Sequence, residues 1–445
     1  MLTNYQDFLS TKKRVWTGVG AEPGVLPSSL YDWQAAIVRW AVRKGRAAIF
    51  ADCGLGKTFM QVSWAAALDV PTLILAPLCV AEQTVTEAAK LGVDVQYAVD
   101  QASVRSKIAI TNYERLKDFD PSKFRAVVLD ESSILKAFDG QTRTALIQAF
   151  KDTTYRLCCT ATPSPNDITE LANHAEFLGL MTRPEFLATW FIRVDAGHRT
   201  TTHHGWRIKR HAVEPFYRWL SSWAMALRSP ADLGYDASAF TLPKLQIFDE
   251  VLPIDAPIGD ALFPEMGVHG LSGRLAARRT ILADRVAAVK RMTLTGRRHH
   301  GGCAWLLWCG LNEESDALAK AIPDAVNVQG SDSYASKVGA VQAFVKGDIR
   351  VLISKPKILG FGMNFQHCHH MAFVGLSDSY ETYYQCIRRA WRYGQKLPVS
   401  VHIVVSEAEQ MVVENVRRKE AAADDLSASL VKHMVDFERQ EVGAA

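Results

Sequence analysis

Two series of short apolar runs constrain the fold of this chain more than any other feature of its sequence. The runs are apolar at nearly every position, which indicates strands buried on both faces, as in parallel sheets covered by helices. Stretches with helical spacing separate the runs, so the pattern predicts two tandem α/β domains. The first series is Ala47–Ala51, Thr72–Ala76, Lys107–Thr111, Ala126–Leu129 and Arg156–Thr160, and the second is Ala304–Cys309, Ala325–Val328, Arg350–Ile353, Met371–Gly375 and Val399–Val405.

The segments around the two series have a different pattern. Residues 181–246 are rich in aromatic and basic side chains, with helical spacing and without strand runs, which predicts an inserted helical lobe. After Ser406 the chain is charged and rich in Ala, which predicts helix almost to its end. The expected organisation is an N-terminal extension at 1–29, a first domain at 30–180, a helical and basic insertion at 181–246, a second domain at 247–406 and a helical tail at 407–445.

Composition excludes several classes of protein. Of the 445 residues 48% are hydrophobic and 22% charged, which is typical of globular proteins and not of disordered or collagen-like chains. Eight cysteines without a CxxC pair indicate a reducing cytoplasm rather than a disulfide framework. The longest apolar window, Trp64–Ala81, is split by Asp69, Pro71 and Pro77, so we expect a soluble cytoplasmic protein without a membrane span. A formal net charge of +4 at pH 7 means that any basic surface is local.

The strongest local signal is a Gly-rich loop between a predicted strand and a predicted helix. It is typical of loops that cradle phosphates, although Ala51 stands where the strict pattern has Gly. Gly54 and Gly56 let backbone N–H groups approach phosphate oxygens. Lys57 is expected to reach the β- and γ-phosphates of ATP, and Thr58 to hold Mg²⁺. The predicted ATP-binding residues of the loop are Asp52, Cys53, Gly54, Leu55, Gly56, Lys57 and Thr58.

Two carboxylates provide the second signal. Asp130 and Glu131 follow the apolar run Ala126–Leu129. Ligands of doubly wound sheets bind at the carboxyl ends of the strands, where both acids are expected to lie. Asp130 is expected to hold Mg²⁺, while Glu131 orients and deprotonates the attacking water. With Lys57, these acids are the predicted catalytic residues of the first domain.

From about Leu30 to about Glu407 the chain resembles the superfamily-two helicases and translocases, most closely their Swi/Snf-type branch. The resemblance rests on Tyr31-Asp32-Trp33-Gln34, on the blocks beginning at Leu73 and Ile108, and on Thr160-Ala161-Thr162-Pro163. The run from Asp130 departs from the family's DEAH-type pattern, since Ser133 stands where His is common. The resemblance implies that Gln34 reads adenine, that Thr160 and Thr162 couple ATP state to nucleic acid, and that Pro77, Thr111, Asn112 and Tyr113 line the nucleic-acid path.

The second half of the chain carries further motifs of the same family. They are Gln329-Gly330-Ser331, Gly360-Phe361-Gly362-Met363-Asn364-Phe365 and the closing stretch from Gln385 to Gln395. The resemblance implies an ATP contact for Gly362 and Gln385 and nucleic-acid contacts for Gly330, Ser331 and Asn364. This half looks especially like short helicase-like proteins encoded by bacteriophages and prophages.

An arginine pair in the closing stretch completes the predicted catalytic set. Arg389 and Arg392 are three residues apart, so on a helix both would point the same way. We expect them to act as fingers on the γ-phosphate. Arg388 would lie off that face and tolerate replacement. An arginine-rich solvated helix face is the alternative interpretation.

Three weaker clusters stay open. His367-Cys368-His369-His370 favours a polar loop, since no second ligand pair at metal-binding spacing is visible, and no structural metal is expected. The stretch with His203, His204, Arg207, Lys209, Arg210 and His211, and the run from Arg274 to His300, are basic. Each suits phosphate contact, and a solvated basic face would show the same pattern.

The function that these motifs favour is an ATP-dependent DNA translocase or helicase with ATP and Mg²⁺ as ligands and DNA, most simply duplex, as partner. A strand-separating DNA or RNA helicase is one alternative. A nucleotide-gated nucleic-acid-binding switch with slow hydrolysis is another. A protein partner supplying specificity is compatible with the sequence, because no nuclease, methyltransferase or specificity domain is evident in it.

Overall fold

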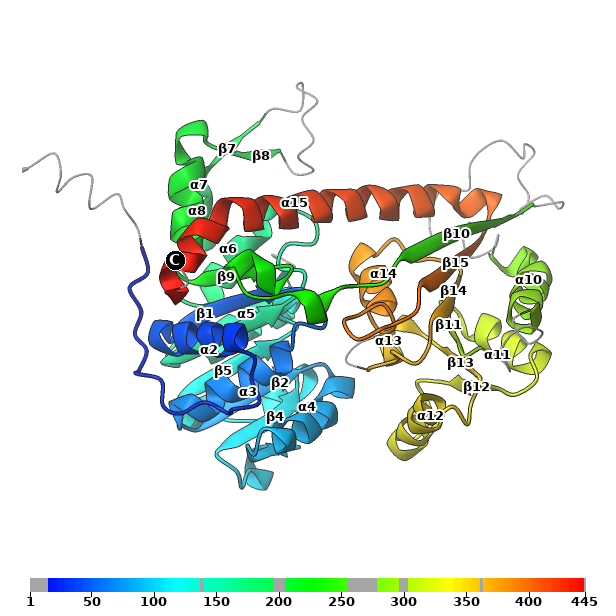
Figure 1. The fold of residues 1–445 in the computed structure, drawn as a ribbon, viewed down its shortest axis with the longest axis horizontal. Coiled ribbons are helices and arrows are strands. Elements are labelled where there is room, and N and C mark those ends of the chain that lie inside the picture. Colours follow the sequence, from blue (N-terminus) through cyan, green and yellow to red (C-terminus); the bar gives the residue numbers. More distant parts are fainter. Residues whose placement is uncertain are drawn as a thin grey trace, which may run out of the picture. The chain divides into compact units, whose positions relative to one another are not determined.

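The computed structural model describes residues 15–136, 140–194, 205–253, 278–295, 303–360 and 363–443. These residues form two compact units, each with its own sheet (Figure 1). The first unit comprises Met1–Phe240 and Ala421–Ala445, and the second comprises Thr241–Glu420. The end of the chain therefore belongs to the unit in which the chain begins.

The first unit is built on a seven-stranded sheet in the order β3-β4-β2-β5-β6-β1-β9, in which every neighbouring pair is parallel. The five central strands are buried along almost their whole length, as their continuous apolar runs predict. Its strands are β1 (Arg46–Ala51), β2 (Thr72–Ala76), β3 (Val95–Tyr97), β4 (Ile108–Asn112), β5 (Ala126–Asp130), β6 (Tyr155–Thr160) and β9 (Ala224–Leu227).

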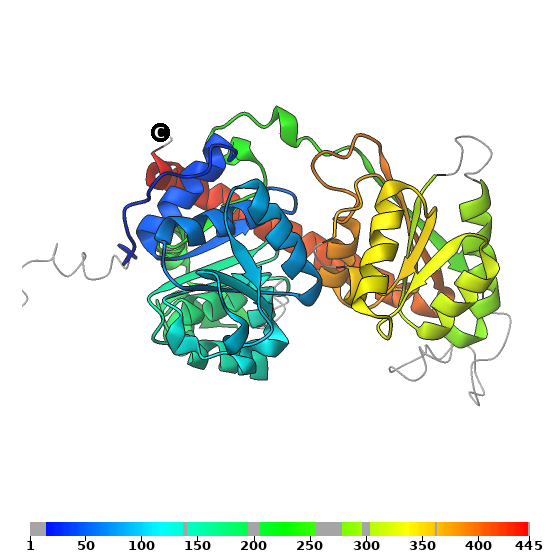
Figure 2. The same cartoon turned by 90° about the horizontal axis from the view of Figure 1, so that it is seen from below.

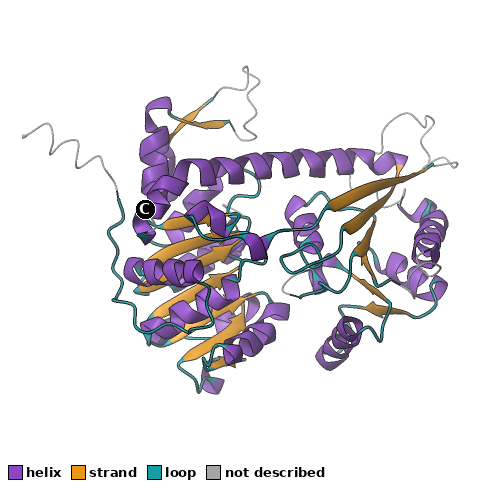
Figure 3. Cartoon of the chain, in the orientation of Figure 1, coloured by secondary structure: helices purple, strands orange, loops and turns teal. Residues whose placement is uncertain are grey.

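Helices connect these strands and flank the sheet (Figure 3). They are α2 (Asp32–Lys44), α3 (Lys57–Leu68), α4 (Leu78–Lys90), α5 (Gln141–Ala149), α6 (Leu171–Phe177), α7 (Arg183–Trp190) and α8 (Val213–Ser221). Their apolar sides share one core with the sheet, in which Phe177, Phe186 and Phe216 are fully buried. The alternation of parallel strands and helices confirms the predicted α/β class for this unit.

The prediction that 181–246 is helical and without strands is wrong in part. The segment contains α7 and α8, but also the antiparallel pair β7 (Phe191–Arg193) and β8 (Trp206–Ile208), and it contains β9. Strand β9 pairs with β1 and extends the main sheet at its edge. Its four residues are too few to be recognised as a strand from the sequence. They form a strand here by pairing with the edge of β1.

The second unit contains a six-stranded parallel sheet in the order β10-β15-β14-β11-β13-β12. The edge strand β10 was not expected, because its side chains are half-buried or exposed and the run is therefore not continuously apolar. The strands are β10 (Leu245–Leu252), β11 (Trp305–Cys309), β12 (Ala325–Val328), β13 (Val351–Ser354), β14 (His370–Val374) and β15 (Val399–Ser406). The helices are α10 (Leu282–Thr295), α11 (Asn312–Ala321), α12 (Tyr334–Lys346), α13 (Pro356–Leu359) and α14 (Tyr380–Ile387); Figure 2 gives a second view of both units.

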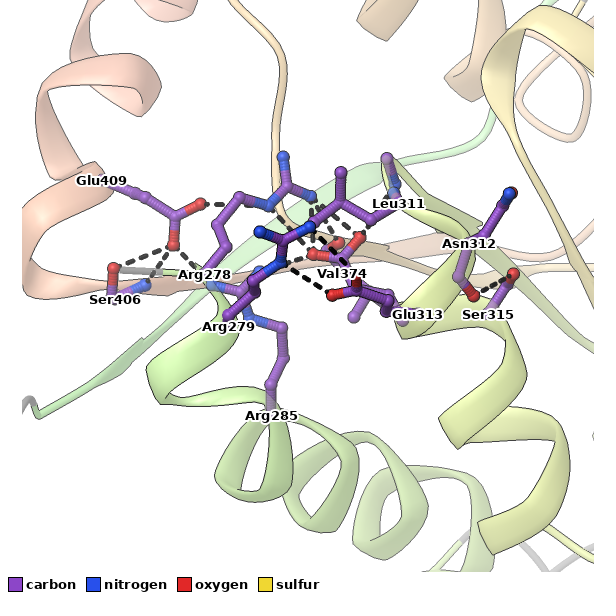
Figure 4. A network of polar contacts seen from close by, with 12 residues as sticks. Arg278, Arg279, Arg285, Leu311, Asn312, Glu313, Ser315, Val374, Ser406 and Glu409 are labelled. Atoms are coloured by element: carbon purple, nitrogen blue, oxygen red, sulfur yellow. Dashed lines mark hydrogen bonds and ion pairs between the residues drawn. The ribbon is translucent and has the colours of Figure 1, made fainter. Parts of the chain in front are cut away.

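A buried ionic network ties α10 and α11 to the end of β15 (Figure 4). Arg285 is 0% exposed and pairs with both Glu314 and Glu409. Glu314 also accepts hydrogen bonds from the N–H groups of Gly310 and Leu311, at 3.0 and 2.9 Å. Buried charges are tolerated when each is paired and hydrogen-bonded in this way, and removing one partner is strongly destabilising.

A long helix, α15 (Gln410–Val442), follows the second sheet, and the predicted helical tail is confirmed as helix. Leu430 and Met434 near its C-terminal end lie in the core of the first unit. Glu438 accepts a hydrogen bond from the N–H of Ala226, 2.6 Å away, and so covers the outer edge of β9. Across the described ranges, no helix combines the length and the apolar character that crossing a membrane requires.

The buried Glu438 carboxyl is expected to make the stability of the first unit depend on pH. Burial, with a smaller contribution from Asp232, raises the pKa of Glu438 from 4.5 to about 8. Because the folded-state pKa lies above the unfolded one, its contribution to folding is fully present below pH 4.5 and is lost as the pH rises through about 8. Thermal unfolding from about pH 5 to pH 9 should show the Tm falling by more than about 4 °C.

The variant Glu438→Gln isolates this contribution, because its amide resembles the neutral acid and still accepts from Ala226. The fall in Tm between low and high pH should be much smaller in this variant. The exposed Glu214 supplies the control, and Glu214→Gln should keep the wild-type slope. An unchanged slope in Glu438→Gln would assign the pH dependence to other groups.

Candidate functional site

The Gly-rich loop joins β1 to α3, as the sequence predicts. Gly54 and Gly56 have φ values of 90° and 75°, the left-handed region that favours glycine. A Cβ atom on Gly56 would lie 2.4 Å from the Nε2 atom of Gln34. Glycine at position 56 thus avoids both a strained backbone and a clash with Gln34. The loop ends at the N-terminus of α3, a favourable place for an anion.

Gln34 is the side chain that closes one side of this loop. Its Nε2 donates to the carbonyl oxygen of Leu55 at 3.0 Å, and its Oε1 accepts from the N–H of Tyr31 at 3.1 Å. Gln34 thus links the start of α2 to the loop, in the place where the family resemblance puts the adenine contact. Whether it reads adenine stays a prediction.

Lys57 and Asp52 also engage the loop. The Lys57 Nζ donates to the carbonyl oxygens of Ala51 at 2.8 Å and Asp52 at 3.3 Å. The Oδ1 of Asp52 accepts from the N–H of Cys53 at 2.7 Å. The Lys57 side chain therefore folds back onto the start of the phosphate-binding loop. Thr58 follows it in the first turn of α3.

Replacing Gly56 with Ala should weaken ATP binding. The new Cβ would meet the Gln34 amide and strain the backbone at φ 75°, which costs about 1–3 kcal/mol, or about 5–150-fold in affinity. Titration with a fluorescent ATP analogue measures the loss. Gly92→Ala is the matched control, because Gly92 also has positive φ but nothing lies within 4 Å of its added Cβ. Equal affinity in Gly56→Ala and wild type would contradict this role for the loop.

The two predicted catalytic carboxylates lie at the carboxyl end of β5. Asp130 is 5% exposed, and burial together with the neighbouring Glu131 raises its pKa to about 7, against the opposing influence of Lys57. Glu131 has φ 56°, an uncommon value for a residue that is not glycine. Its Oε2 accepts a hydrogen bond from the Thr160 hydroxyl at 3.3 Å.

The predicted coupling residues are connected to these acids. The Thr160 hydroxyl oxygen accepts from the N–H of Thr162 at 3.1 Å while its proton points to Glu131. The register pairs Phe50 of β1 with Thr160 of β6, and Asp130 of β5 with Cys159. The loop, the acids and the coupling segment therefore lie at the same edge of one sheet.

Two contacts that support the acids were not found by sequence reasoning. Tyr113, predicted as a nucleic-acid contact, is buried, and its hydroxyl donates to the carbonyl oxygen of Asp130 at 2.7 Å. The Ser132 hydroxyl lies 3.1 Å from Nε2 of the buried His174, whose pKa burial lowers to about 4. Both contacts stabilise the turn after β5, and no sequence signal singles out His174, because Asn173 and Glu176 are polar residues of the same helix.

The remaining predicted nucleic-acid residues of the first unit lie at the same edge of the sheet. Pro77 follows β2, and Asn112 ends β4 with its Nδ2 donating to Glu114 Oε2 at 2.6 Å. Thr111 is fully buried and Asn112 nearly so. A contact between these two residues and nucleic acid stays a prediction, and of the three only Pro77 is partly exposed.

In the second unit Arg389 and Gln385 form one polar group. The Arg389 guanidinium donates to the Gln385 side-chain oxygen at 2.6 Å, to the Gln385 carbonyl at 2.9 Å and to the Met363 carbonyl at 3.4 Å. Arg392 is half-buried. Gly362 lies outside the described residues.

The helical-spacing argument for these arginines is wrong. Helix α14 ends at Ile387, and the residues after it form turns, so Arg389 and Arg392 do not lie on a helix face. Arg388 is 2% exposed, and its guanidinium lies 5.0 Å from the ring centroid of Trp391 and 5.6 Å from that of Tyr384. Arg388 is thus a buried side chain held by contacts with aromatic rings. Its replacement is therefore expected to destabilise the unit rather than to be tolerated.

The other predicted nucleic-acid residues of this unit are exposed. Gly330 and Ser331 follow β12, and the Gly330 carbonyl accepts from Lys337 Nζ at 2.7 Å. Asn364 is exposed and bonds to Gln366. Their accessibility is compatible with the predicted contacts, which stay predictions.

Some described side chains of the two basic stretches are held by other groups, while Arg207, Arg210 and His211 are exposed. His203 and His204 lie outside the described residues, as do 274–277 and 296–300. Lys209 is bonded to the carbonyl oxygens of Ala188 and Thr189. Arg285 of the second stretch is fully buried in ion pairs and is therefore not available to a polyanion.

Comparison with known proteins agrees with this geometry. The helicase conserved C-terminal domain family matches residues 286–394. A solved structure of S. cerevisiae Dbp5 bound to RNA and ADP BeF3 is similar over 91% of this chain and 93% of that chain, with a TM-score of 0.55 and 12% sequence identity. No curated protein matches the sequence. The chain thus has two tandem RecA-like domains, and the second carries a helicase C-terminal domain. These findings support an ATP-hydrolysing enzyme of the helicase type.

Proposed function

We propose that this protein is an ATP-dependent translocase of the superfamily-two type that moves along DNA, most simply duplex DNA. The observation that supports it best is the hydrogen-bonded chain from Glu131 through the Thr160 hydroxyl to the N–H of Thr162. A chain of this kind gives the catalytic carboxylate a direct contact with the segment proposed to sense nucleic acid. A protein that only bound ATP would not need it.

The residues of the first unit have distinct proposed roles. Thr58 and Asp130 would hold Mg²⁺, which supplies positive charge to the phosphates when it is bound. Lys57 exchanges its carbonyl contacts for the β- and γ-phosphates. Glu131 accepts a proton from the attacking water, and Thr160 orients its carboxylate for this step. Their positions at one sheet edge fit a nucleotide with its metal.

The second unit is proposed to complete the reaction with Arg389 and Arg392, and Gln385 and Gly362 are proposed to contact ATP. A guanidinium near the γ-phosphate stabilises the charge that develops during transfer. Gln385 already holds Arg389 through two hydrogen bonds, which limits the orientations of the guanidinium. ATP binding and release would then alternate the grip of the two domains on the nucleic acid.

The choice of DNA rests on the Swi/Snf-type motifs, while the solved neighbour is bound to RNA. A strand-separating RNA or DNA helicase is therefore the second candidate. A slow nucleotide-gated switch is less well supported, because the described residues contain both carboxylates, the loop lysine and both arginines. We also propose a cytoplasmic location in a bacterial host, on the resemblance to phage and prophage proteins.

Steady-state ATP turnover measured with duplex DNA, single-stranded DNA, forked DNA and RNA tests the proposal. Duplex DNA should stimulate turnover at least as well as single strands, and its binding should weaken steeply with salt because counterions are released. Displacement of a triplex strand without unwinding of a fork would indicate translocation. Activation by RNA alone would overturn the choice of DNA, and a slow rate unchanged by any nucleic acid would favour the switch.

A further inference from the structure

Three side chains with metal-binding atoms converge in the second unit, two of them from the histidine-rich cluster at 367–370. They are Cys303, just before β11, and His369 and His370, at the start of β14. One ligand atom of each, the Cys303 Sγ and a ring nitrogen of each histidine, lies within 4.8 Å of the other two. Among the described residues, no other such group of histidine, cysteine or carboxylate side chains is present.

The backbone holds the three residues in register. Strand β11 pairs with β14 so that Trp305 lies opposite His370. The thiol of the buried Cys368 donates to the carbonyl oxygens of Ala304 and His370, at 3.3 and 3.1 Å. The carbonyl oxygen of His369 accepts from the N–H of Ser400 at 2.8 Å. The Cys368 thiol is therefore occupied by backbone carbonyls, and the loop places His369 and His370 beside Cys303.

The two imidazoles are also positioned by ring contacts. The His370 ring stacks on Trp305 with centroids 4.9 Å apart, and Trp305 is itself buried in the core. The His369 and His370 rings are 4.3 Å apart. All three residues are half-buried, and Cys303 alone is partly exposed among the cysteines whose side chains are described. The cluster is thus ordered by its surroundings and still open to an ion from solvent.

We propose that Cys303, His369 and His370 bind a zinc ion, with a water molecule as the fourth ligand. One thiolate and two imidazoles are ligands that Zn²⁺ prefers. Bonds of about 2.0–2.3 Å to a tetrahedral zinc place ligand atoms about 3.3–3.8 Å apart, so small side-chain rotations bring the cluster into range. The sequence favoured a polar loop here because no second ligand was visible at a suitable spacing; the fold supplies Cys303 from the strand next in the sheet.

A metal at this place would brace the loop 365–370, which is hydrogen-bonded to the closing arginine segment. The Gln395 side chain donates to the carbonyl oxygens of Gln366 and Cys368, at 2.8 and 3.1 Å. The Phe365 N–H donates to the Arg389 carbonyl at 2.9 Å. The zinc site would therefore restrict the motion of the segment 365–370. Through these hydrogen bonds it would also restrict the backbone at Arg389.

Cobalt binding to the full-length, chelator-treated protein tests the site. One equivalent of Co²⁺ should give a thiolate-to-cobalt charge-transfer band and the visible bands of tetrahedral cobalt, and Zn²⁺ should abolish both. Cys303→Ser should remove the charge-transfer band, and His370→Ala should weaken Zn²⁺ binding by at least about 10–100-fold. His211→Ala, which removes an exposed histidine of the first unit, should change neither.

A thiol reagent gives an independent readout that does not depend on activity. Cys303 should react fastest among the described cysteines in the metal-free protein, and one equivalent of Zn²⁺ should protect it. Cys303→Ser shows which modification is lost, and circular dichroism shows whether each variant is folded. The proposal is overturned if folded wild-type protein gives no charge-transfer band, or if Zn²⁺ leaves the rate of Cys303 modification unchanged.

Discussion

Replacing Glu131 with Gln is expected to stop ATP hydrolysis while leaving ATP binding nearly intact. The amide keeps the size of the side chain and still accepts from the Thr160 hydroxyl, but it does not take a proton from water. Loss of a general base costs about 10²–10⁴-fold in rate. Single-turnover hydrolysis and nucleotide titration, run on the same preparation, separate the chemical step from binding.

Lys57→Ala should fail in a different way. It removes the positive charge that Lys57 is proposed to place on the β- and γ-phosphates. ATP turnover should therefore be lost, and ATP affinity should fall as well. Glu82→Gln supplies the control for both variants, since Glu82 is an exposed carboxylate on α4 of the same unit. Wild-type turnover in Glu131→Gln would contradict the proposal that Glu131 is the general base. Unchanged ATP affinity in Lys57→Ala would contradict the proposal that the loop binds the phosphates.

The parts of the fold that the sequence predicts well are those fixed by local chemistry. The central strands of both sheets are continuous apolar runs, and the loop from Ala51 to Thr58 needs its glycines at φ values that other residues rarely adopt. Such features are visible in a few consecutive residues. The two α/β domains follow from the strand runs, and the helical tail follows from the charged, Ala-rich stretch after Ser406.

The parts that were missed depend on partners distant in sequence. Strand β9 exists because β1 has a free edge, and Glu438 reaches it from the end of the chain. Arg388 is adjacent to Arg389 in sequence, yet one is enclosed by aromatic rings and the other is bonded to Gln385. Neither environment can be read from spacing alone.

The candidate sites divide in the same way. The motifs located Lys57, Asp130 and Glu131, but not the Tyr113 hydroxyl that holds the Asp130 backbone. The histidine pair at the start of β14 was visible as a motif, and only the pairing of β11 with β14 brings Cys303 to it. Ligand sets assembled across a sheet are therefore the features that a single sequence conceals.

Replacing Arg389 or Arg392 with Ala is expected to lower nucleic-acid-stimulated turnover by about 10³–10⁵-fold, the contribution of an arginine finger. ATP and nucleic-acid affinity should change much less, because the proposed contacts for both are largely made by other residues. Steady-state kinetics with binding titrations measures each quantity. Arg388→Ala is unsuitable as the control, since Arg388 is buried, and Arg418→Ala is better because Arg418 is exposed on α15 within the same unit.

The contacts of Arg389 make a sharper version of this test possible. Gln385 is uncharged. Its side-chain and backbone oxygens both accept hydrogen bonds from the Arg389 guanidinium and so orient it. Gln385→Ala should therefore lower turnover while Arg389 is still present, and by less than Arg389→Ala. If Gln385 acts only by orienting the guanidinium, the double variant should be no slower than Arg389→Ala, because an orienting contact has no value once the guanidinium is gone; its proposed contact with ATP would add a further loss. Additive losses would show that Gln385 acts by itself, and wild-type turnover in both arginine variants would refute the proposal that the second unit completes the ATP site.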